Sequence, residues 1–329
     1  MTTLVTGATG LLGGNLVRQL VEQGEQVRAL VRPRQRRGPS AIGGLPVEIV
    51  IGDVTDLESV RQAMRGCRRV YHVAGQLGMG SGQGERFRRV NIEGTVNVCR
   101  AALEAGVERL VHTSTVGTIG WATDGRPVDE TSPWNFTDWP VPYIVTKRAA
   151  EKKVQEFVHQ GLPAVIVNPS YCFGPWDTNP SSGILLQVVA TGLLVAAPGG
   201  GANFVDVRDV ARGHILAMAR GRVGERYILG GENLSWMDFF TLAARLLGVR
   251  PPRFVIPRRP AVLGGYWADL LARLGVPMPI SANGMHTFYV DHYVSSEKAR
   301  RELGYRSSST RKAIADAITW MREYGYLRI

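Results

Sequence analysis

A glycine-rich turn between a short apolar strand and a helix constrains the fold of this chain more than any other feature. The turn covers residues 7–13 (GATGLLG) and directly follows an apolar run at residues 3–6. Leucine and valine then recur at helical spacing up to Gly24, and a second apolar run occupies residues 27–31. This order predicts a strand–helix–strand unit, whose glycines allow a tight turn and whose helix N-terminus favours a bound phosphate.

The alternation of strands and helices continues through the first half of the chain. Each expected strand is apolar along its length, which is typical of parallel strands buried on both faces. Right-handed crossovers then place helices on both sides of one sheet. We therefore predict an α/β fold built on a doubly wound parallel Rossmann sheet. Further strands are expected at residues 47–50, 69–74, 109–113 and 164–168, and helices at 57–64, 85–105 and 143–160.

The composition changes after Pro169, because Gly, Pro, Ser and Asn crowd residues 174–183. We predict a dinucleotide-binding Rossmann domain over residues 1–170, to which residues 205–230 return. Residues 171–204 and 231–329 are expected to form a smaller, mixed α/β substrate-binding lobe. Helices are expected there and in the returning segment at 183–192, 208–219, 235–247, 260–274, 295–303 and 310–324, and weaker strands near Val195, Phe204 and residues 227–229.

The formal net charge is +11, from 39 lysines and arginines against 28 acidic residues. Because the basic residues are spread along the chain, a protein that binds an anionic cofactor is a better interpretation than one with a nucleic-acid partner. The three cysteines lack disulfide or zinc spacing, which indicates free thiols in a reducing, cytoplasmic compartment. No apolar stretch approaches about 20 residues and no signal-peptide pattern occurs, so we expect neither a membrane span nor a membrane partner.

The end of the second strand bears on which dinucleotide binds. An NAD-selective site usually has an acidic residue there, to accept a hydrogen bond from the ribose 2′-hydroxyl. This chain has Arg32, followed by Arg34, Arg36 and Arg37. A guanidinium can bind a 2′-phosphate through two charge-assisted hydrogen bonds. We therefore predict that NADP(H) is preferred over NAD(H).

Two further strand ends are expected to contact the dinucleotide. Asp53 and Val54 follow the third strand, and the Asp53 carboxylate can accept a hydrogen bond from the adenine amino group. Helix capping is the alternative role for a carboxylate here, and it suits Asp56 better than Asp53. Val73, Ala74 and Gly75 end the fourth strand, where small residues let the backbone lie against a ribose.

A tyrosine and a lysine lie four residues apart, at Tyr143 and Lys147, and share one face of the expected helix. A phenol with a reference pKa of about 10 is a poor acid or base, and a nearby ammonium lowers that pKa. The hydroxyl cluster at residues 113–115 (TST) ends the fifth strand, at the sheet edge where open α/β folds bind ligands. The spacing alone is also compatible with an ordinary helix face.

Taken together, these motifs resemble the extended short-chain dehydrogenase/reductase superfamily over essentially the whole chain. Within it the chain is most similar to the dihydroflavonol 4-reductase-like group, and to its bacterial branch of hopanoid-associated sugar epimerases. The superfamily motifs are at residues 6–13 (TGATGLLG), 52–54 (GDV), 72–75 (HVAG), 90–95 (VNIEGT), 143 with 147, 168–169 (NP) and 204–211 (FVDVRDVA). The closer similarity is at residues 28–33 (RALVRP), 102–109 (ALEAGVER), 225–233 (ERYILGGEN) and 302–305 (ELGY).

The resemblance implies a role for each matching residue. Tyr143 would be the general acid/base, Lys147 would lower its pKa and bind the nicotinamide ribose, and Thr115 would donate a hydrogen bond to the substrate oxygen. Ser114 would take the role of Thr115 if the alignment of this chain with the family motif is off by one residue. Asn91 would help to order the active-site helix. The cofactor-binding set is Gly7, Thr9, Gly10, Leu11, Leu12, Gly13, Arg32, Asp53, Val54, Val73, Ala74, Gly75, Thr113, Tyr143, Lys147, Pro169, Tyr171 and Cys172.

Substrate contacts are less specific in the sequence. Gln76 and Met79, in the glycine-rich loop 75–84, are expected beside the substrate, as are Thr115, Trp176 and Phe204. Aromatic residues in the expected cleft segments suggest an apolar or aromatic substrate, although each can equally be a core residue. These are Trp121, Trp134, Trp139, Tyr171, Phe173, Trp176 and Phe204. His286, Asp291 and His292 fit no metal motif, so we expect no metal, and Cys172 is expected to pack.

The sequence therefore favours an NADP(H)-dependent carbonyl reductase or alcohol dehydrogenase that acts on a small ketone, aldehyde or alcohol. A nucleotide-sugar epimerase or dehydratase that uses tightly bound NAD(P) is the alternative. A non-catalytic NADP-binding regulatory protein is the third reading. We expect a homodimer, because the helices at 86–105 and 143–160 commonly form the dimer face in this superfamily.

Overall fold

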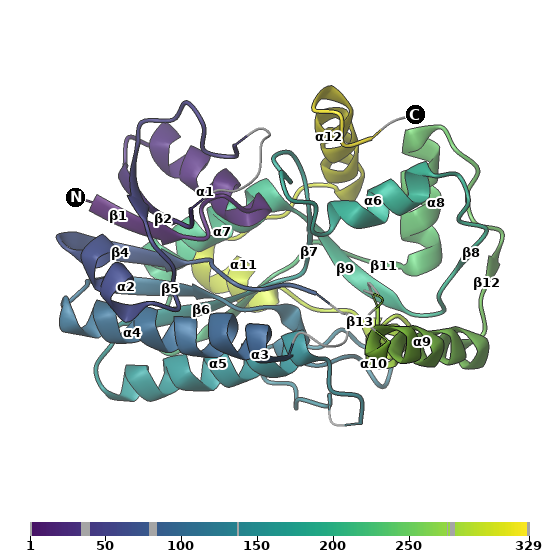
Figure 1. Ribbon diagram of the computed structural model, residues 1–329, viewed down its shortest axis with the longest axis horizontal. Helices are drawn as coiled ribbons and strands as arrows, with labels where there is room; N and C mark the ends of the chain where they lie inside the picture. Colours follow the sequence, from purple (N-terminus) through teal and green to yellow (C-terminus); the bar gives the residue numbers. More distant parts are fainter. Residues whose placement is uncertain are drawn as a thin grey trace.

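A seven-stranded sheet, parallel throughout, forms the centre of the computed structural model (Figure 1). The structure describes residues 2–33, 40–78, 84–136, 138–274, 276 and 280–327. Its order is β10-β6-β5-β4-β1-β2-β3, which confirms the doubly wound Rossmann fold. The strands are β1 (Thr2–Thr6), β2 (Gln26–Val31), β3 (Val47–Ile51), β4 (Cys67–His72), β5 (Arg109–Thr113), β6 (Ala164–Pro169) and β10 (Arg226–Leu229). Arg34, Arg36, Arg37 and Met79 lie outside the described residues.

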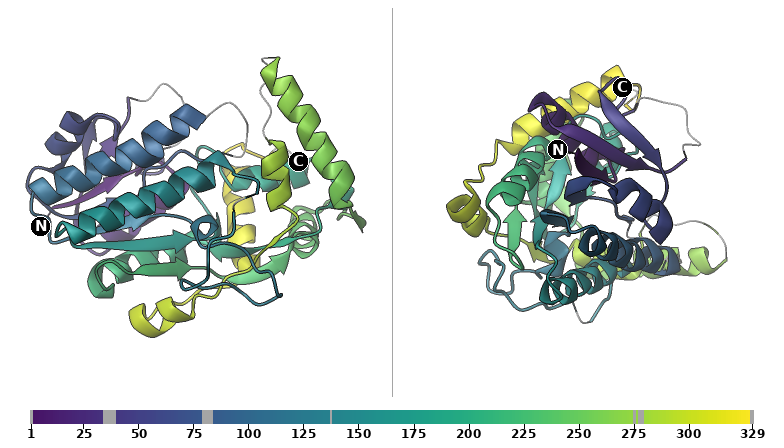
Figure 2. Two further views of the ribbon diagram at one scale, coloured as in Figure 1. Left: turned by 90° about the horizontal axis from the view of Figure 1, so that it is seen from below. Right: turned by 90° about the vertical axis from the view of Figure 1, so that its left-hand side faces the viewer.

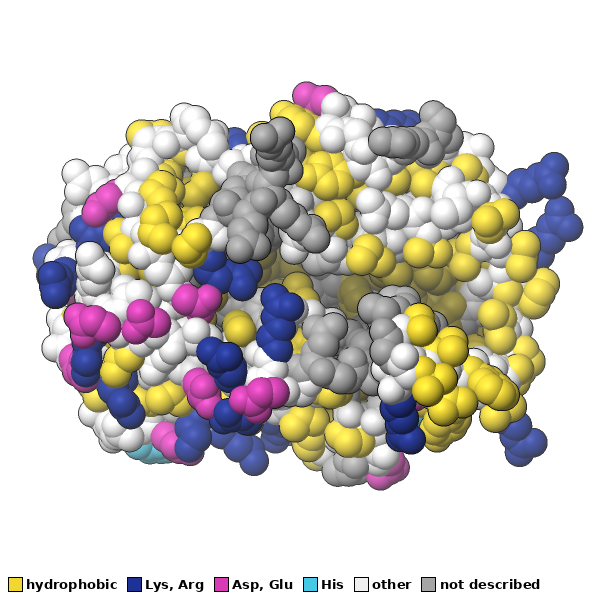
Figure 3. All heavy atoms as spheres, in the orientation of Figure 1, with side chains coloured by type: hydrophobic (Ala, Val, Ile, Leu, Met, Phe, Trp, Pro, Cys, Tyr) yellow, Lys and Arg dark blue, Asp and Glu magenta, His cyan; other side chains and the backbone are white. Residues whose placement is uncertain are grey.

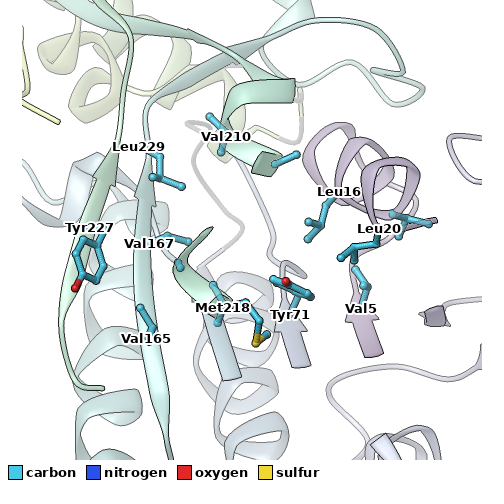
Figure 4. Packing of buried hydrophobic residues seen from close by; sticks show 14 of the residues in the cluster. Val5, Leu16, Leu20, Tyr71, Val165, Val167, Val210, Met218, Tyr227 and Leu229 are labelled. Atoms are coloured by element: carbon cyan, nitrogen blue, oxygen red, sulfur yellow. The ribbon is translucent and has the colours of Figure 1, made fainter. Parts of the chain in front are cut away.

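Helices cover both faces of the sheet. On one face, α1 (Leu11–Glu22), α7 (Val207–Arg220) and α11 (Glu297–Leu303) bury apolar side chains against the strands. Figure 4 shows this layer, where Leu16 and Leu20 of α1 approach Val5 of β1. The other face is covered by α2 (Leu57–Met64), α4 (Gly94–Glu104) and α5 (Pro142–His159).

The expected helix at residues 85–105 is not a continuous α-helix. It begins as α3 (Gly84–Phe87), widens to a π-helical segment at Arg88–Glu93 and continues as α4. π-Helical turns inside α-helices often occur at functional sites, because they redirect one side chain. Here the widened segment contains Asn91, which is buried.

A smaller lobe follows β6 and contains a mixed sheet in the order β11-β9-β13, with β7 also paired to β9. Its strands are β7 (Tyr171–Phe173), β9 (Gly201–Asp206), β11 (Glu232–Ser235) and β13 (Asp291–His292), and β8 (Ala196–Ala197) pairs with β12 (Phe254–Val255). Its helices are α6 (Gly183–Ala190), α8 (Trp236–Leu247), α9 (Arg258–Arg273), α10 (Ala282–Thr287) and α12 (Thr310–Glu323). No helix among the described residues is both long enough and apolar enough to cross a bilayer.

The two lobes are interleaved along the chain. After β9, the segment that forms α7 and β10 returns to the main sheet, where β10 pairs with β6. Helix α11 also packs there, because Ala299 and Leu303 belong to the same buried cluster as β1 and α7. Helix α11 lies within residues 231–329, which we expected in the substrate-binding lobe, and its apolar face packs on the main sheet. Sequence periodicity detects the helix but not the lobe on which its apolar face packs.

Candidate functional site

The glycine turn has no space for side chains at two of its positions. Gly7 has φ +73°, and a Cβ there would lie 2.6 Å from the backbone nitrogen of Ala74. A Cβ on Gly13 would lie 2.2 Å from the Gly7 carbonyl oxygen. A Cβ on Gly10 meets only an ordinary contact at 3.5 Å. The turn therefore brings β1, the start of α1 and the end of β4 close together.

The N-terminus of α1 offers donors to an anion. Its N-cap, Gly10, has no side chain to accept a hydrogen bond from the first turn, and that turn contains no acidic residue. The N–H groups of Leu11, Leu12 and Gly13 have no acceptor within their own helix, and the helix dipole adds positive potential. This arrangement fits the diphosphate of a dinucleotide. Thr9 is exposed beside it, and its carbonyl accepts a hydrogen bond from Thr178.

The ends of β2 and β3 lie next to β1 in the sheet. Arg32, just after β2, is exposed. Asp53 holds its own loop together, because its carboxylate accepts hydrogen bonds from the backbone and the hydroxyl of Thr55, both at 2.9 Å. Asp56 caps α2 by accepting from the backbone of Glu58, as the sequence indicated. Val54 is buried, and its carbonyl accepts from Asn97.

The loop after β4 is fixed by Asn91. The Asn91 side chain accepts from the backbone N–H of Gln76 at 2.8 Å and donates to the Gln76 carbonyl at 3.1 Å. It also donates to the hydroxyl of Thr146 on α5, at 3.1 Å. The π-helical segment thus ties the strip Val73, Ala74 and Gly75 to the helix that carries Tyr143 and Lys147.

Tyr143 and Thr115 lie together, on α5 and on the loop after β5. Burial raises the pKa of Tyr143 to about 12, and a hydrogen bond with the Thr115 hydroxyl opposes that rise. This differs from the sequence expectation of a lowered pKa, because desolvation of the phenolate is the largest effect. Tyr143 is therefore a neutral phenol near pH 7, which is the form that donates a proton.

Lys147 is buried one turn further along α5. Its ammonium donates a hydrogen bond of 2.6 Å to the carbonyl of Thr113, at the end of β5. Burial lowers the pKa of Lys147 to about 8, and the Glu151 carboxylate opposes this effect. A Cβ on Gly75 would lie 3.8 Å from the Lys147 Nζ atom, so the ammonium also faces the end of β4.

Sequence reasoning missed the network that positions Thr115. Asn168 of β6 donates hydrogen bonds to the Thr115 carbonyl at 3.1 Å and to the Glu151 carboxylate at 2.6 Å. The Thr118 hydroxyl donates to the same carboxylate at 2.8 Å. The spacing 143, 147, 151 along one helix face was the available signal. The Ser114 hydroxyl, by contrast, is buried with no partner among the described residues, which favours Thr115 over Ser114.

The strand that leads into the smaller lobe passes close to Tyr143. Pro169 ends β6, and Tyr171 and Cys172 begin β7. Burial raises the pKa of Tyr171, and the nearby ionisable Tyr143 raises it further; Cys172 has the same smaller effect on the pKa of Tyr143. Burial raises the pKa of the Cys172 thiol to about 12. Cys172 is therefore an unreactive thiol at neutral pH.

The structure divides the aromatic residues of the sequence into two groups. One is the aromatic cluster (Trp121, Trp134, Phe136 and Trp139), which packs against Tyr143 from the loop before α5. The Trp121 and Trp139 rings stack at 4.6 Å, and all three tryptophans are partly exposed. Figure 3 shows a hollow between the two lobes with hydrophobic side chains in it.

The second aromatic group is structural, which corrects one predicted substrate contact. Phe204 is fully buried and stacks on Phe239 at 4.3 Å, so a substrate cannot reach it. Strand β9 is buried on every residue, and sequence alone does not separate such a ring from one that lines a cleft. Trp176 packs under the Arg18 guanidinium and beside Trp320 of α12, away from the aromatic cluster.

The histidines of the smaller lobe belong to the aromatic packing. His292 stacks on Phe136 at 5.4 Å, and His286 stacks on Trp139 at 5.4 Å. Among the described residues no three His, Cys, Asp or Glu side chains converge in a way that would hold a metal ion. The buried His72 and His112 lie on β4 and β5, as expected for core positions.

A family model described as the NAD dependent epimerase/dehydratase family matches residues 3–230. The chain belongs to this family.

Two curated relatives are each 37% identical to this chain. One is a Synechocystis protein provisionally named dihydroflavonol 4-reductase, with 98% of this chain and 95% of the relative covered. The other is sterol demethylase protein B of Methylococcus capsulatus, with 99% and 100% covered. A crystal structure titled gox2253 has 38% identity and a TM-score of 0.88, with 99% of each chain covered.

This epimerase/dehydratase family member is therefore an oxidoreductase-type enzyme of the extended short-chain dehydrogenase/reductase superfamily, as the motifs implied. The family match covers the glycine turn, the α5 residues and the returning segment through Gly230. The glycine turn, the strip from Val73 to Gly75 and residues 113–115 follow the carboxyl ends of β1, β4 and β5, which are neighbours in the sheet, and Arg32 and Asp53 follow β2 and β3.

Proposed function

We propose that this protein is an NADP(H)-dependent carbonyl reductase or alcohol dehydrogenase. The observation that supports this most strongly is the pairing of Tyr143 with Thr115 on the sheet edge that carries the glycine turn. Two hydroxyl groups together can bind one carbonyl oxygen and protonate it. Beside them, Lys147 supplies a buried ammonium.

In this proposal the chain provides orientation and a proton, and a bound nicotinamide supplies the hydride. Thr115 donates a hydrogen bond to the substrate oxygen and fixes its position. Tyr143 donates its phenolic proton to that oxygen as negative charge develops there. A positioned general acid of this kind contributes roughly 10²–10⁴-fold in rate. Lys147 stabilises the phenolate that remains, and Asn91 keeps α5 in place against the loop at Gln76.

The residues expected to hold the cofactor are those of the glycine turn, the β2 and β3 ends, and the strip from Val73 to Gly75. We propose that NADP(H) is preferred, because Arg32 is an exposed guanidinium where an NAD-selective site has a carboxylate. Tyr171 and Cys172 are proposed to pass beside the nicotinamide, since both interact with Tyr143, and Pro169 is included because it ends the strand that leads to them.

The substrate is proposed to be an apolar or aromatic carbonyl compound. The tryptophans of the aromatic cluster and Tyr143 pack on the same buried residues, Phe136, Val141 and Ile144, so the cluster can cover the apolar part of a substrate whose oxygen reaches Thr115. The names of the two curated relatives refer to a dihydroflavonol and a sterol, whose skeletons are aromatic or alicyclic rings. Gln76, which is half-buried in the loop after β4, is the proposed polar contact.

Sugar epimerisation is the second candidate, because the family description includes it. A nucleotide sugar needs cations for its diphosphate. Arg208, at the start of α7, could supply one, but its guanidinium is paired with Asp206 and Asp316, each at 2.5 Å. This observation favours the reductase.

A substrate panel distinguishes the two. The full-length protein is incubated with NADPH and apolar ketones or aldehydes, and NADPH absorbance is followed. A reductase consumes NADPH in proportion to the alcohol formed. An epimerase consumes none, and instead interconverts nucleotide sugars with no net change in cofactor absorbance.

A further inference from the structure

Helix α9 exposes its large apolar side chains to solvent. They form an outer stripe of six residues, which recur at helical spacing along one face. Trp267 is 67% exposed, Leu263 60% and Leu274, just beyond the helix, 73%. The outer stripe comprises Leu263, Tyr266, Trp267, Leu270, Leu271 and Leu274. Figure 2 shows α9 along the outer margin of the molecule, and Figure 3 shows hydrophobic side chains gathered there.

The opposite face of α9, which packs on α10, is made of small residues. Val262, Gly265 and Ala268 are buried, and a Cβ on Gly265 would lie 2.7 Å from the Cα of Ala282. The helix therefore docks by its small residues and presents its large ones outward. This is the reverse of an ordinary surface helix, whose large apolar residues face the core. The outer stripe is too large and continuous to be scattered surface apolarity.

The charge of α9 is mostly positive. The helix has Arg258, Arg259 and Arg273, no lysine and one carboxylate, Asp269. That carboxylate faces α10, where it accepts a hydrogen bond from the backbone of Ala282. Arg259 and Arg273 are exposed near the two ends of α9. The adjacent strand β12 adds exposed Phe254 and Val255.

We propose that α9 binds to the surface of a membrane that contains anionic lipid. An interfacial helix of this kind places Trp, Tyr and Leu side chains among the acyl chains and arginines among the headgroups. A second copy of the chain fits less well. In a two-fold interface the same surface meets itself, so the arginines of both copies would face one another. This departs from the sequence expectation of no membrane partner, which considered only spanning segments.

The membrane-facing helix is connected to the catalytic site. His286 of α10 lies between Arg258 of α9, at 2.9 Å, and the Trp139 ring. Asn283 of α10 donates to the carbonyl of Pro140, three residues before Tyr143. A membrane bound at α9 thus lies beside the aromatic cluster, where an apolar substrate dissolved in lipid would reach the cleft. The membrane binding itself does not depend on the proposed reaction.

Vesicle co-sedimentation of the full-length protein tests the proposal. Vesicles of phosphatidylcholine alone are compared with vesicles of equal parts phosphatidylcholine and phosphatidylglycerol. We expect binding to the anionic vesicles that weakens with added salt. The double variant Trp267→Ser/Leu270→Ser should reduce the partition coefficient at least about tenfold, whereas Ile49→Ser/Val223→Ser, two exposed apolar residues elsewhere, should not.

A second set of variants tests the role of charge. The double variant Arg259→Glu/Arg273→Glu should lose its preference for anionic vesicles, whereas Arg311→Glu on α12 should keep it. Far-UV circular dichroism and thermal unfolding should be unchanged, because all these side chains are exposed. Equal sedimentation of the wild-type protein and the Trp267→Ser/Leu270→Ser variant would overturn the proposal. The proposal would also be overturned if the wild-type protein does not bind vesicles but forms a dimer, and the Trp267→Ser/Leu270→Ser variant is a monomer.

Discussion

At the scale of single residues, three side chains of the candidate site lie along one face of α5. Tyr143, Lys147 and Glu151 recur every four residues, which places them one above another. The sequence predicted the first two because their spacing and their place before β6 are visible without a structure. Glu151 was missed because its partners, Asn168 and Thr118, come from other elements. Phe204 was wrongly placed because a buried ring and a cleft ring look alike in sequence.

Lys147 should limit the enzyme at alkaline pH. Its pKa is about 8, because burial disfavours the ammonium, whereas Tyr143, with a pKa of about 12, stays protonated. The ammonium is lost as the pH rises through 8, so kcat/KM for carbonyl reduction should fall there. Lys147→Arg keeps its charge and should move the fall to higher pH in a pH–rate profile. An unmoved alkaline limb would refute this assignment.

Arg32 should decide between the two dinucleotides. Arg32→Ala removes the charge proposed to bind the 2′-phosphate, and should lower the ratio of NADPH to NADH affinity by about tenfold to hundredfold. Titration calorimetry with each cofactor measures this ratio. Arg126→Ala, at another exposed arginine, is the control. If the Arg32 variant keeps the wild-type ratio, the NADP(H) preference is not set by this residue.

At the scale of elements, the spacing of apolar residues along the sequence predicted the regular strands and helices of the main sheet but missed the irregular elements. Most strands of the main sheet are short runs rich in apolar residues, although β4 contains Arg68 and Arg69. The π-helical segment was missed because a widened turn leaves the apolar spacing nearly unchanged. Strands β11 and β13 were missed because two to four residues show no alternation, and both are defined by long-range pairing with β9.

The glycine turn gives a matched test at this scale. Gly13→Ala would place a Cβ 2.2 Å from the Gly7 carbonyl, so it should cost roughly 1–3 kcal/mol in the free energy of unfolding. Gly10→Ala meets only an ordinary contact at 3.5 Å and should change the stability little. Urea unfolding of both variants gives the comparison. Equal stabilities would mean that the turn relaxes around a methyl group.

At the scale of the whole molecule, the proposed homodimer is expected to use the face formed by α4 and α5, which pack side by side (Figure 2). Val145 of α5 is 37% exposed on this helix. Val145→Glu should weaken the dimer, because it buries a charge at an apolar contact. Light scattering should show a dimer for the wild-type protein and for Val223→Glu, and a monomer for Val145→Glu. A monomeric wild-type protein would contradict the prediction.

The central claim is that Tyr143 protonates a carbonyl oxygen during NADPH-dependent reduction. The most direct test is single-turnover NADPH oxidation, with a ketone identified from the substrate panel, by the wild-type protein, Tyr143→Phe and Tyr324→Phe. Tyr324 is an exposed tyrosine at the end of α12. We predict a loss of roughly 10²–10⁴-fold for Tyr143→Phe and wild-type rates for Tyr324→Phe. Reduction by Tyr143→Phe at the wild-type rate would contradict the account.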